Sequence, residues 1–162
     1  MSLRGLGFQY QLSDAFYIAA DWYTICWNQF LIEGNDGIAY NPISLTSEKT
    51  STIKPVHQFR FGMEYLVKNV HQGYAIPIRW GIFYDPSPAE TQSDDFYGVT
   101  FGTGFVKRKP FIQKNRFDKW FSLDIAYQYR FGDASIPYFE NNGLSDTVDD
   151  HRIYVSMIYY LQ

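Results

Sequence analysis

The feature that most constrains this chain is a strict period of two along residues 73–85. The even positions from Tyr74 to Tyr84 are all large and apolar, whereas the odd positions are mostly small, polar or charged, as at Arg79 and Asp85. Successive side chains of a β-strand point to opposite faces, so this segment is predicted to be a strand with one continuous apolar face. Its length also suits a tilted strand that crosses a lipid bilayer.

The same alternation recurs in six further segments, and no segment has a convincing helical pattern. A soluble β-sandwich would alternate in the same way with its apolar face inside, so the period alone leaves that architecture open. Every charged residue in the middle of an expected strand falls on the less apolar face: Asp21, Arg60, Glu64, Arg79, Asp124, Arg130 and Arg152. The expected strands are residues 5–12, 16–27, 56–67, 73–85, 96–106, 120–131 and 151–161.

Composition narrows the ways in which such a chain could meet a membrane. The mean hydropathy of -0.29 and the lack of a long apolar run exclude a membrane-spanning helix. A membrane barrel remains compatible with low hydropathy because only every second residue faces lipid. The single cysteine, Cys26, excludes an intrachain disulfide. Residues 1–4 lack the apolar core of a signal peptide, so we expect them to be a foreign or disordered start and 5–162 to be an internal piece of an exported protein.

The connections between the expected strands alternate in length, which favours a membrane barrel over a sandwich. Residues 13–15 and 68–72 are tight turns, whereas 28–55 and 132–150 are long. Outer-membrane barrels have short periplasmic turns and longer external loops in this alternating arrangement. The long connections are strongly acidic and 107–119 is basic, so the two ends of the sheet are expected to differ in charge.

The distribution of aromatic residues agrees with this interpretation. Aromatic residues make up 20% of the chain and gather near the ends of the expected strands, as at Tyr74 and Tyr84. Interfacial girdles of membrane barrels have this distribution. The sequence thus predicts an all-β, antiparallel, up-and-down transmembrane β-barrel. Single-chain bacterial barrels have an even number of strands, so about seven strands are expected to be part of a larger barrel.

Several segments resemble passages of the FadL/TodX family. In residues 78–88, Ile-Arg-Trp-Gly-Ile-Phe-Tyr-Asp-Pro-Ser-Pro, an Arg-x-Gly strand runs into Tyr-Asp-x-Ser-Pro as it does in that family. The Leu-Asp-x-Ala-Tyr core at 123–127 is similar to a later strand, and Gly-Met-Glu-Tyr at 62–65 is similar to the strand that precedes residues 78–88. Leu-Ser-Asp-Ala at 12–15, with Trp27 and Phe30, is similar to an earlier hairpin. The matches keep the family's order and span nearly the whole chain.

The resemblance implies a location and a function. Members of that family are barrels of about fourteen strands in the bacterial outer membrane, which take up long-chain fatty acids or aromatic hydrocarbons by diffusion. This chain would be the C-terminal half, and its partners would be membrane lipid, lipopolysaccharide, the hydrophobic substrate and the N-terminal half with its hatch. The hatch and the lateral exit belong to that missing half. The loop after Asp85 lacks the family's usual proline-rich approach to the next strand.

The charged residues of the less apolar face are the candidate ligand-binding groups. The arginines could bind a fatty-acid carboxylate in the lumen. They could instead pair across strands with Asp21, Glu64 and Asp124, which only neutralises charge inside the barrel. Three glycines share that face and are expected either to leave space for a hatch or ligand or to permit sheet curvature: Gly98, Gly102 and Gly104.

The chain is not expected to be an enzyme, and no cofactor, metal site or nucleic-acid partner is predicted. His57 and His151 fall on the outward face, and His71 lies in a turn, so neither Ser156 nor Cys26 has a base nearby. The histidines and acidic loops lack the spacing of a metal site. Two other functions stay open: a small soluble β-barrel that carries a lipophilic ligand, and an outer-membrane barrel that serves only as an anchor.

Overall fold

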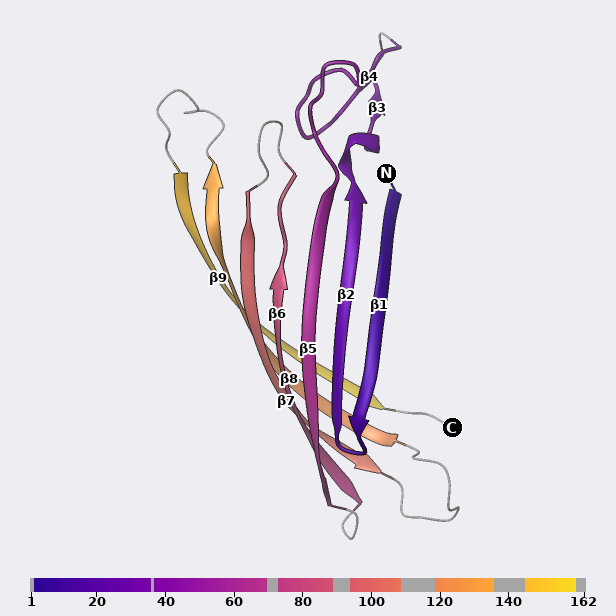
Figure 1. Cartoon of the computed structure of the whole chain (residues 1–162), viewed down its shortest axis with the longest axis vertical. Helices are drawn as coiled ribbons and strands as arrows, with labels where there is room; N and C mark the ends of the chain where they lie inside the picture. Colours follow the sequence, from indigo (N-terminus) through magenta and orange to yellow (C-terminus); the bar gives the residue numbers. More distant parts are fainter. Residues whose placement is uncertain are drawn as a thin grey trace.

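The chain folds as an all-β protein around one seven-stranded antiparallel sheet (Figure 1). The computed structural model describes residues 2–35, 37–69, 73–88, 94–108, 119–135 and 145–159. The strand order in the sheet is β1-β2-β5-β6-β7-β8-β9, so neighbours in the sheet follow one another along the chain. Its strands are β1 (Ser2–Ser13), β2 (Phe16–Cys26), β5 (Val56–Asn69), β6 (Tyr74–Tyr84), β7 (Phe96–Arg108), β8 (Lys119–Ser135) and β9 (Ser145–Tyr159).

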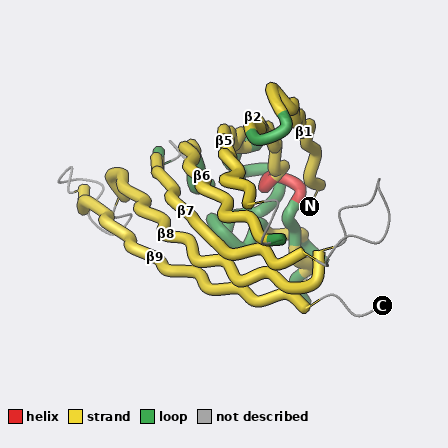
Figure 2. Tube along the Cα trace, turned by 90° about the horizontal axis from the view of Figure 1, so that it is seen from below, coloured by secondary structure: helices red, strands yellow, loops and turns green. Residues whose placement is uncertain are grey.

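The main sheet is curved and remains open, because β1 and β9 form its two edges and do not pair with each other. Figure 2 shows the strands following one another along an arc, with β1 and β9 at its two ends. The connection from β2 to β5 contains a 3-10 helix, η1 (Trp27–Gln29), and a two-stranded sheet of β3 (Ile32–Glu33) and β4 (Ala39–Tyr40). We call the end of the main sheet that carries this connection the loop end, and the opposite end the turn end. None of the described helices has the length and apolar character needed to cross a membrane.

The expected strands are all present, and three of them differ from the expected limits by three residues or more at one end. β1 begins at Ser2 and pairs Arg4 with Thr24, so residues 2–4 continue the strand instead of forming a separate start. β8 and β9 extend to Ser135 and Ser145, where Asp133 pairs with Thr147, although these acidic segments were expected to be loop. Asp133 and Asp149 have the same parity as the convex apolar positions of their strands, so they continue that face beyond its apolar band. Tyr160 and Leu161, which were predicted to end the last strand, lie outside the described residues.

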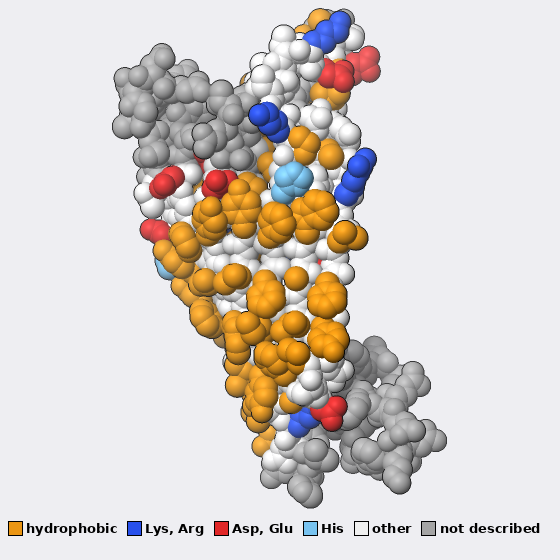
Figure 3. All heavy atoms as spheres, in the orientation of Figure 1, with side chains coloured by type: hydrophobic (Ala, Val, Ile, Leu, Met, Phe, Trp, Pro, Cys, Tyr) orange, Lys and Arg blue, Asp and Glu red, His pale blue; other side chains and the backbone are white. Residues whose placement is uncertain are grey.

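The register places the predicted apolar positions of all seven strands on one face, which we call the convex face. Directly paired residues share a face of a sheet, and Trp22, Phe59, Tyr84, Tyr97 and Phe131 form one such row across β2 to β8. Apolar side chains of the convex face are exposed, and on β9 the exposed fraction is 71% for Ile153, 68% for Val155 and 69% for Met157. Apolar side chains gather over much of this face in Figure 3.

Aromatic rings gather along the convex face near both ends of its apolar band. In the row at the loop end, ring centroids are 6.4 Å apart for Phe59 and Tyr84, 5.2 Å for Tyr84 and Tyr97, and 6.2 Å for Tyr97 and Phe131. At the turn end, Tyr74 stacks on Phe105 with centroids 5.6 Å apart. From Tyr74 to Tyr84 the strand rises about 33 Å, which corresponds to a height of about 25 Å for a strand that is tilted by about 40° as in a barrel.

Candidate functional site

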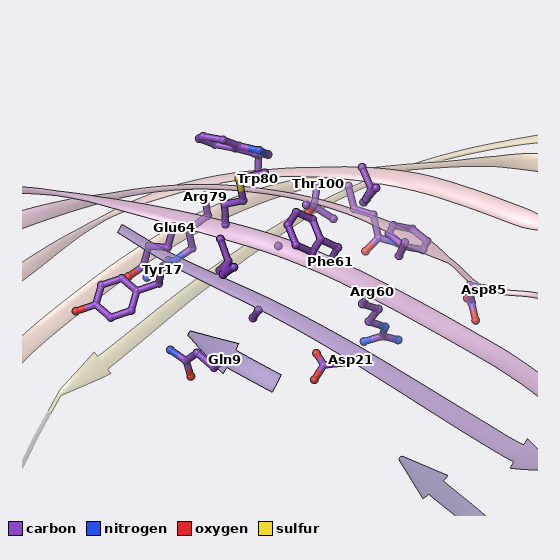
Figure 4. Close-up of a pocket in the computed structure, with 18 of the residues that line it drawn as sticks. Gln9, Tyr17, Asp21, Arg60, Phe61, Glu64, Arg79, Trp80, Asp85 and Thr100 are labelled. Carbon is purple, nitrogen blue, oxygen red and sulfur yellow. Dashed lines mark hydrogen bonds and ion pairs between the residues drawn. The ribbon is translucent and has the colours of Figure 1, made fainter. Parts of the chain in front are cut away.

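The opposite, concave face of the main sheet encloses a space of about 710 Å³. Side chains from all seven strands line it, from Gln9 on β1 to Tyr154 on β9. The pairings Asp21 with Arg60, Glu64 with Arg79 and Gln128 with Arg152 show that the predicted charged residues share this face. Figure 4 shows the side chains of Gln9, Tyr17, Asp21 and Arg60 beneath the sheet, with Trp80 on its other side.

Arg79 lies between two carboxylates near the middle of the concave face. Its Nε donates to Oε2 of Glu64 at 2.6 Å, and its Nη1 donates to Oδ1 of Asp124 at 2.5 Å. Glu64 is on the neighbouring β5, but Asp124 is on β8, so the second bond crosses over β7. The two carboxylates outweigh the single positive charge of Arg79, so a further anion would be repelled here. Glu64, Arg79 and Asp124 therefore follow the alternative of cross-strand pairing, and the cluster keeps a net negative charge.

Glycines on β7 make this crossing possible. Gly102 pairs with Arg79 on one side and with Ala126 on the other, and Gly104 pairs with Asp124. A Cβ at Gly104 would collide with the carboxylate of Asp124, and one at Gly98 would collide with the ring of Phe83. The space beside Gly98 and Gly104 is thus already filled by neighbouring side chains. Only Gly102 has ordinary room beside it, with the nearest atoms 3.4 Å or more from an added Cβ.

Arg130 is held at the loop end of the concave face. Its guanidinium carbon lies 3.7 Å from the centroid of the Phe96 ring, and its Nε is 3.8 Å from Oδ2 of Asp85. Asp85 also accepts a hydrogen bond from the side-chain amide of Gln58. The cation lies over the negative face of the ring, which is the favourable cation–π geometry. Asp85 lines the concave space, as its odd position in the alternation of residues 73–85 predicts.

The last two arginines differ in their partners. Nη2 of Arg152 lies 2.5 Å from Oδ2 of Asp150 on the same strand, an acid that the sequence analysis assigned to a loop. Arg60 lies directly opposite Asp21, yet among the described residues neither makes an ion pair. The Arg60 guanidinium instead lies 5.7 Å from the centroid of the Tyr23 ring. Of the four arginines predicted for this face, Arg60 is therefore the one that has no carboxylate within ion-pair distance among the described residues, although the buried Nε of Arg130 also lacks a hydrogen-bond partner.

Among the described residues, the histidines and Ser156 lie on opposite faces of the main sheet. His57 Nδ1 is 2.9 Å from Thr24 Oγ1 and His151 Nδ1 is 2.7 Å from Tyr127 Oη, both on the convex face as predicted. Ser156 lies on the concave face opposite Asp124, without a histidine on that face. His71 lies outside the described residues. Within the described part of the chain, no group of three or more His, Cys, Asp or Glu side chains could hold a metal ion.

Comparisons with known proteins do not add to this picture. No protein-family model, curated protein or solved structure matches the chain.

Proposed function

We propose that this chain is the C-terminal half of a bacterial outer-membrane β-barrel through which hydrophobic compounds, such as long-chain fatty acids or aromatic hydrocarbons, diffuse. The observation that carries the proposal is the division of the sheet into an exposed apolar convex face and a charged concave face. A soluble barrel buries its apolar face and exposes its charges. A membrane barrel has the opposite arrangement, with lipid outside and a polar lumen inside.

The dimensions of the convex face support a membrane-spanning sheet. The apolar band between Tyr74 and Tyr84 has the roughly 25 Å height of the lipid-facing band of outer-membrane barrels. Rings lie near both ends of this band, where the headgroups of the two leaflets would be. The long β2–β5 connection and the tight turn of residues 14–15 lie at opposite ends of the sheet, as external loops and periplasmic turns do (Figure 1).

The open edges support a larger barrel. In a bilayer, every backbone N–H and C=O must be paired, so β1 and β9 require further strands beside them. The main sheet has an odd number of strands, and single-chain bacterial barrels have an even number. We infer that the remaining strands, with the hatch that the resemblance implies, complete the barrel to about fourteen strands. The soluble carrier is disfavoured because its apolar convex face would be exposed to water.

The concave face supports a substrate with one anionic end. Arg79, Arg130 and Arg152 are each paired with carboxylates, whereas Arg60 is not. A carboxylate bound at Arg60 would leave its hydrocarbon tail beside Phe83, which lines the same space. Since Asp21 lies opposite Arg60, a second anion would be repelled there. This arrangement fits a fatty acid better than a dicarboxylate, and an anchor barrel without substrate has no need of it.

The test of membrane insertion uses the two tryptophans of the convex face. Trp80 lies near the middle of the apolar band and Trp22 in the row at its loop end. In vesicles whose acyl chains are brominated near their middle, we expect fluorescence quenching that Trp80→Phe largely removes and Trp22→Phe reduces less. Light scattering should show a monodisperse β-rich chain only in detergent or lipid. A compact monomer without detergent, and without quenching in vesicles, would contradict the proposal.

The test of substrate class compares a fatty acid with the corresponding alcohol. In detergent, the chain should bind oleate more tightly than oleyl alcohol, and Arg60→Gln should weaken oleate binding about tenfold, as expected for one charge-assisted contact. Arg152→Gln removes the same charge from a paired arginine and is the matched control. Equal losses for both variants would show that net charge, and not Arg60, attracts the carboxylate.

A further inference from the structure

The convex face is not uniformly filled at its loop end. A hollow of about 580 Å³ lies along the row of Trp22, Phe59, Tyr84, Tyr97 and Phe131 and continues to Leu6 on β1 and Val99 on β7. Its volume is in the range of small-ligand pockets, roughly 300–1,000 Å³, so it can hold parts of acyl chains but not a whole lipid. The small side chain of Ala20 lies in the hollow, between its larger neighbours. The hollow extends from β1 to β8 and is therefore wide enough for more than one hydrocarbon chain.

Basic side chains lie immediately beyond this hollow on β1 and β5. Arg4, Thr24 and His57 are paired in one row of the convex face, one step toward the loop end from the row of Leu6, Trp22 and Phe59. The step is two residues along each strand, or about 7 Å, and Arg4 and His57 are two strand spacings apart, or about 10 Å. Both side chains are exposed, and a phosphate between them could accept hydrogen bonds from both.

The acidic side chains near the convex rim lie on the other strands. Tyr84 donates a hydrogen bond to Asp95 at 2.6 Å and Tyr129 donates one to Asp149 at 2.6 Å, which places these carboxylates beside β6, β8 and β9. In Figure 3, Lys and Arg side chains and a histidine border the apolar area over β1, β2 and β5, and acidic side chains border it on the opposite side. An anionic group would therefore be attracted to β1–β5 and repelled from β7–β9.

We propose that the loop end of the convex face is a binding site for lipid A, the phosphate-bearing lipid with several acyl chains. Its phosphate lies between Arg4 and His57, and acyl chains fill the hollow below. The proposal rests on the proposed function, because only a membrane-spanning sheet presents this face to the outer leaflet. The width of the hollow favours a lipid with several chains over a phospholipid with two.

The experiment measures binding of lipid A to the full chain in zwitterionic detergent by native mass spectrometry. Dephosphorylated lipid A, phosphatidylglycerol and inorganic phosphate are the comparison ligands. We expect lipid A to bind at least about tenfold more tightly than its dephosphorylated form, and Arg4→Gln to remove about the same factor, as expected for one charge-assisted contact. His57→Gln should also weaken binding. Ala20→Phe should weaken lipid A binding by filling the hollow.

The control is Lys107→Gln, because Lys107 lies on the convex face at the turn end, where it pairs with Phe121. It removes the same charge and should leave binding of lipid A unchanged. Equal binding of the dephosphorylated lipid, or an Arg4→Gln variant that binds as the parent does, would overturn the inference. Equal binding of phosphatidylglycerol, or displacement of the lipid by millimolar inorganic phosphate, would also overturn it. Failure of membrane insertion would appear separately, as absent quenching of Trp80 in brominated vesicles.

Discussion

On the convex face, Leu6, Val155 and Met157 are about equally exposed and make no specific polar contact, whereas on the concave face Glu64 and Asp124 hold Arg79 between them. The same strands build both faces, because successive residues of each strand point alternately to the convex and the concave face. Under the proposed function, a convex side chain can be exchanged for another apolar one, since only its transfer into lipid matters. Several concave side chains depend on individual partners, as Arg79 does on Glu64 and Asp124.

We therefore expect the two faces to tolerate different substitutions. On the convex face we expect the chemical class of a side chain to decide the outcome, and on the concave face its exact length and charge. The following four predictions test this contrast, in order of decreasing expected effect.

The largest effect is expected from a charge in the middle of the convex face. Phe101 is 58% exposed and pairs with Trp80 near the middle of the apolar band. Phe101→Arg should lower the free energy of unfolding by about 2–4 kcal/mol, the usual cost of a cation at the bilayer midplane. A guanidinium titration in vesicles, followed by tryptophan fluorescence, measures it. Thr100→Arg, which points into the concave space, should change stability by only about 0.5 kcal/mol; equal losses would show that both faces meet lipid.

The next largest loss of stability is expected at one of two glycines of the concave face. At Gly98, an added Cβ would lie 2.6 Å from the carbonyl oxygen of Tyr129 and against the ring of Phe83, so the backbone must shift. Gly98→Ala should therefore cost about 1–3 kcal/mol, as overpacking usually does. Gly102→Ala, with ordinary contacts, should be close to neutral in the same titration. A neutral Gly98→Ala would mean that the Phe83 ring moves away freely.

A smaller effect is expected when the central ion pairs are broken. Arg79→Gln leaves Glu64 and Asp124 without their shared cation, and we expect a loss of about 1–2 kcal/mol, because the three side chains are partly solvated. The triple variant in which Glu64 and Asp124 also become Gln and Asn should recover most of that loss. Independent, additive effects in this cycle would contradict the coupling.

The smallest effect concerns ring contacts at the loop end. Tyr97 has ring neighbours on both sides, Tyr84 and Phe131, so Tyr97→Leu should cost about 0.5–1.5 kcal/mol beyond the change in apolar area. Phe101→Leu is the matched control. Phe101 makes no ring contact with any of the residues that the structure describes, so this control should cost less. Equal changes would indicate that only membrane anchoring, and not ring stacking, acts in the row.

The alternation of residue types was sufficient to predict which face each strand residue occupies. From Asp21 on β2 to Arg152 on β9, all seven predicted charged positions lie on the concave face. Parity depends only on the period of a strand, so errors in strand limits do not affect it. The limits themselves were less predictable. The acidic residues around Asp133 and Asp149 resemble loop composition, although they continue β8 and β9.

The partners of the charged residues could not be predicted from the sequence. Which residue lies opposite Arg79 depends on the register, which the lengths of the turns determine. The bond from Arg79 to Asp124 also needs β7 to have no side chain in its way, a condition set by Gly102. The sequence analysis recognised the glycines as a group but assigned them to a ligand or to curvature. The hairpin of β3 and β4 was missed because each strand has only two residues.

The connection between β2 and β5 has a consequence for how this sheet assembles. Every other adjacent pair in the main sheet is joined by a shorter connection, so β2 and β5 have the longest search for each other. Closing a loop costs only about 0.6 kcal/mol for each doubling of its length. The fully buried side chain of Asn41 shortens the effective loop further, because it donates to the carbonyl of Trp27 at 3.0 Å and accepts from the amide of Ile43 at 3.0 Å. We therefore expect Asn41→Ala to loosen this connection and to slow the pairing of β2 with β5 during folding.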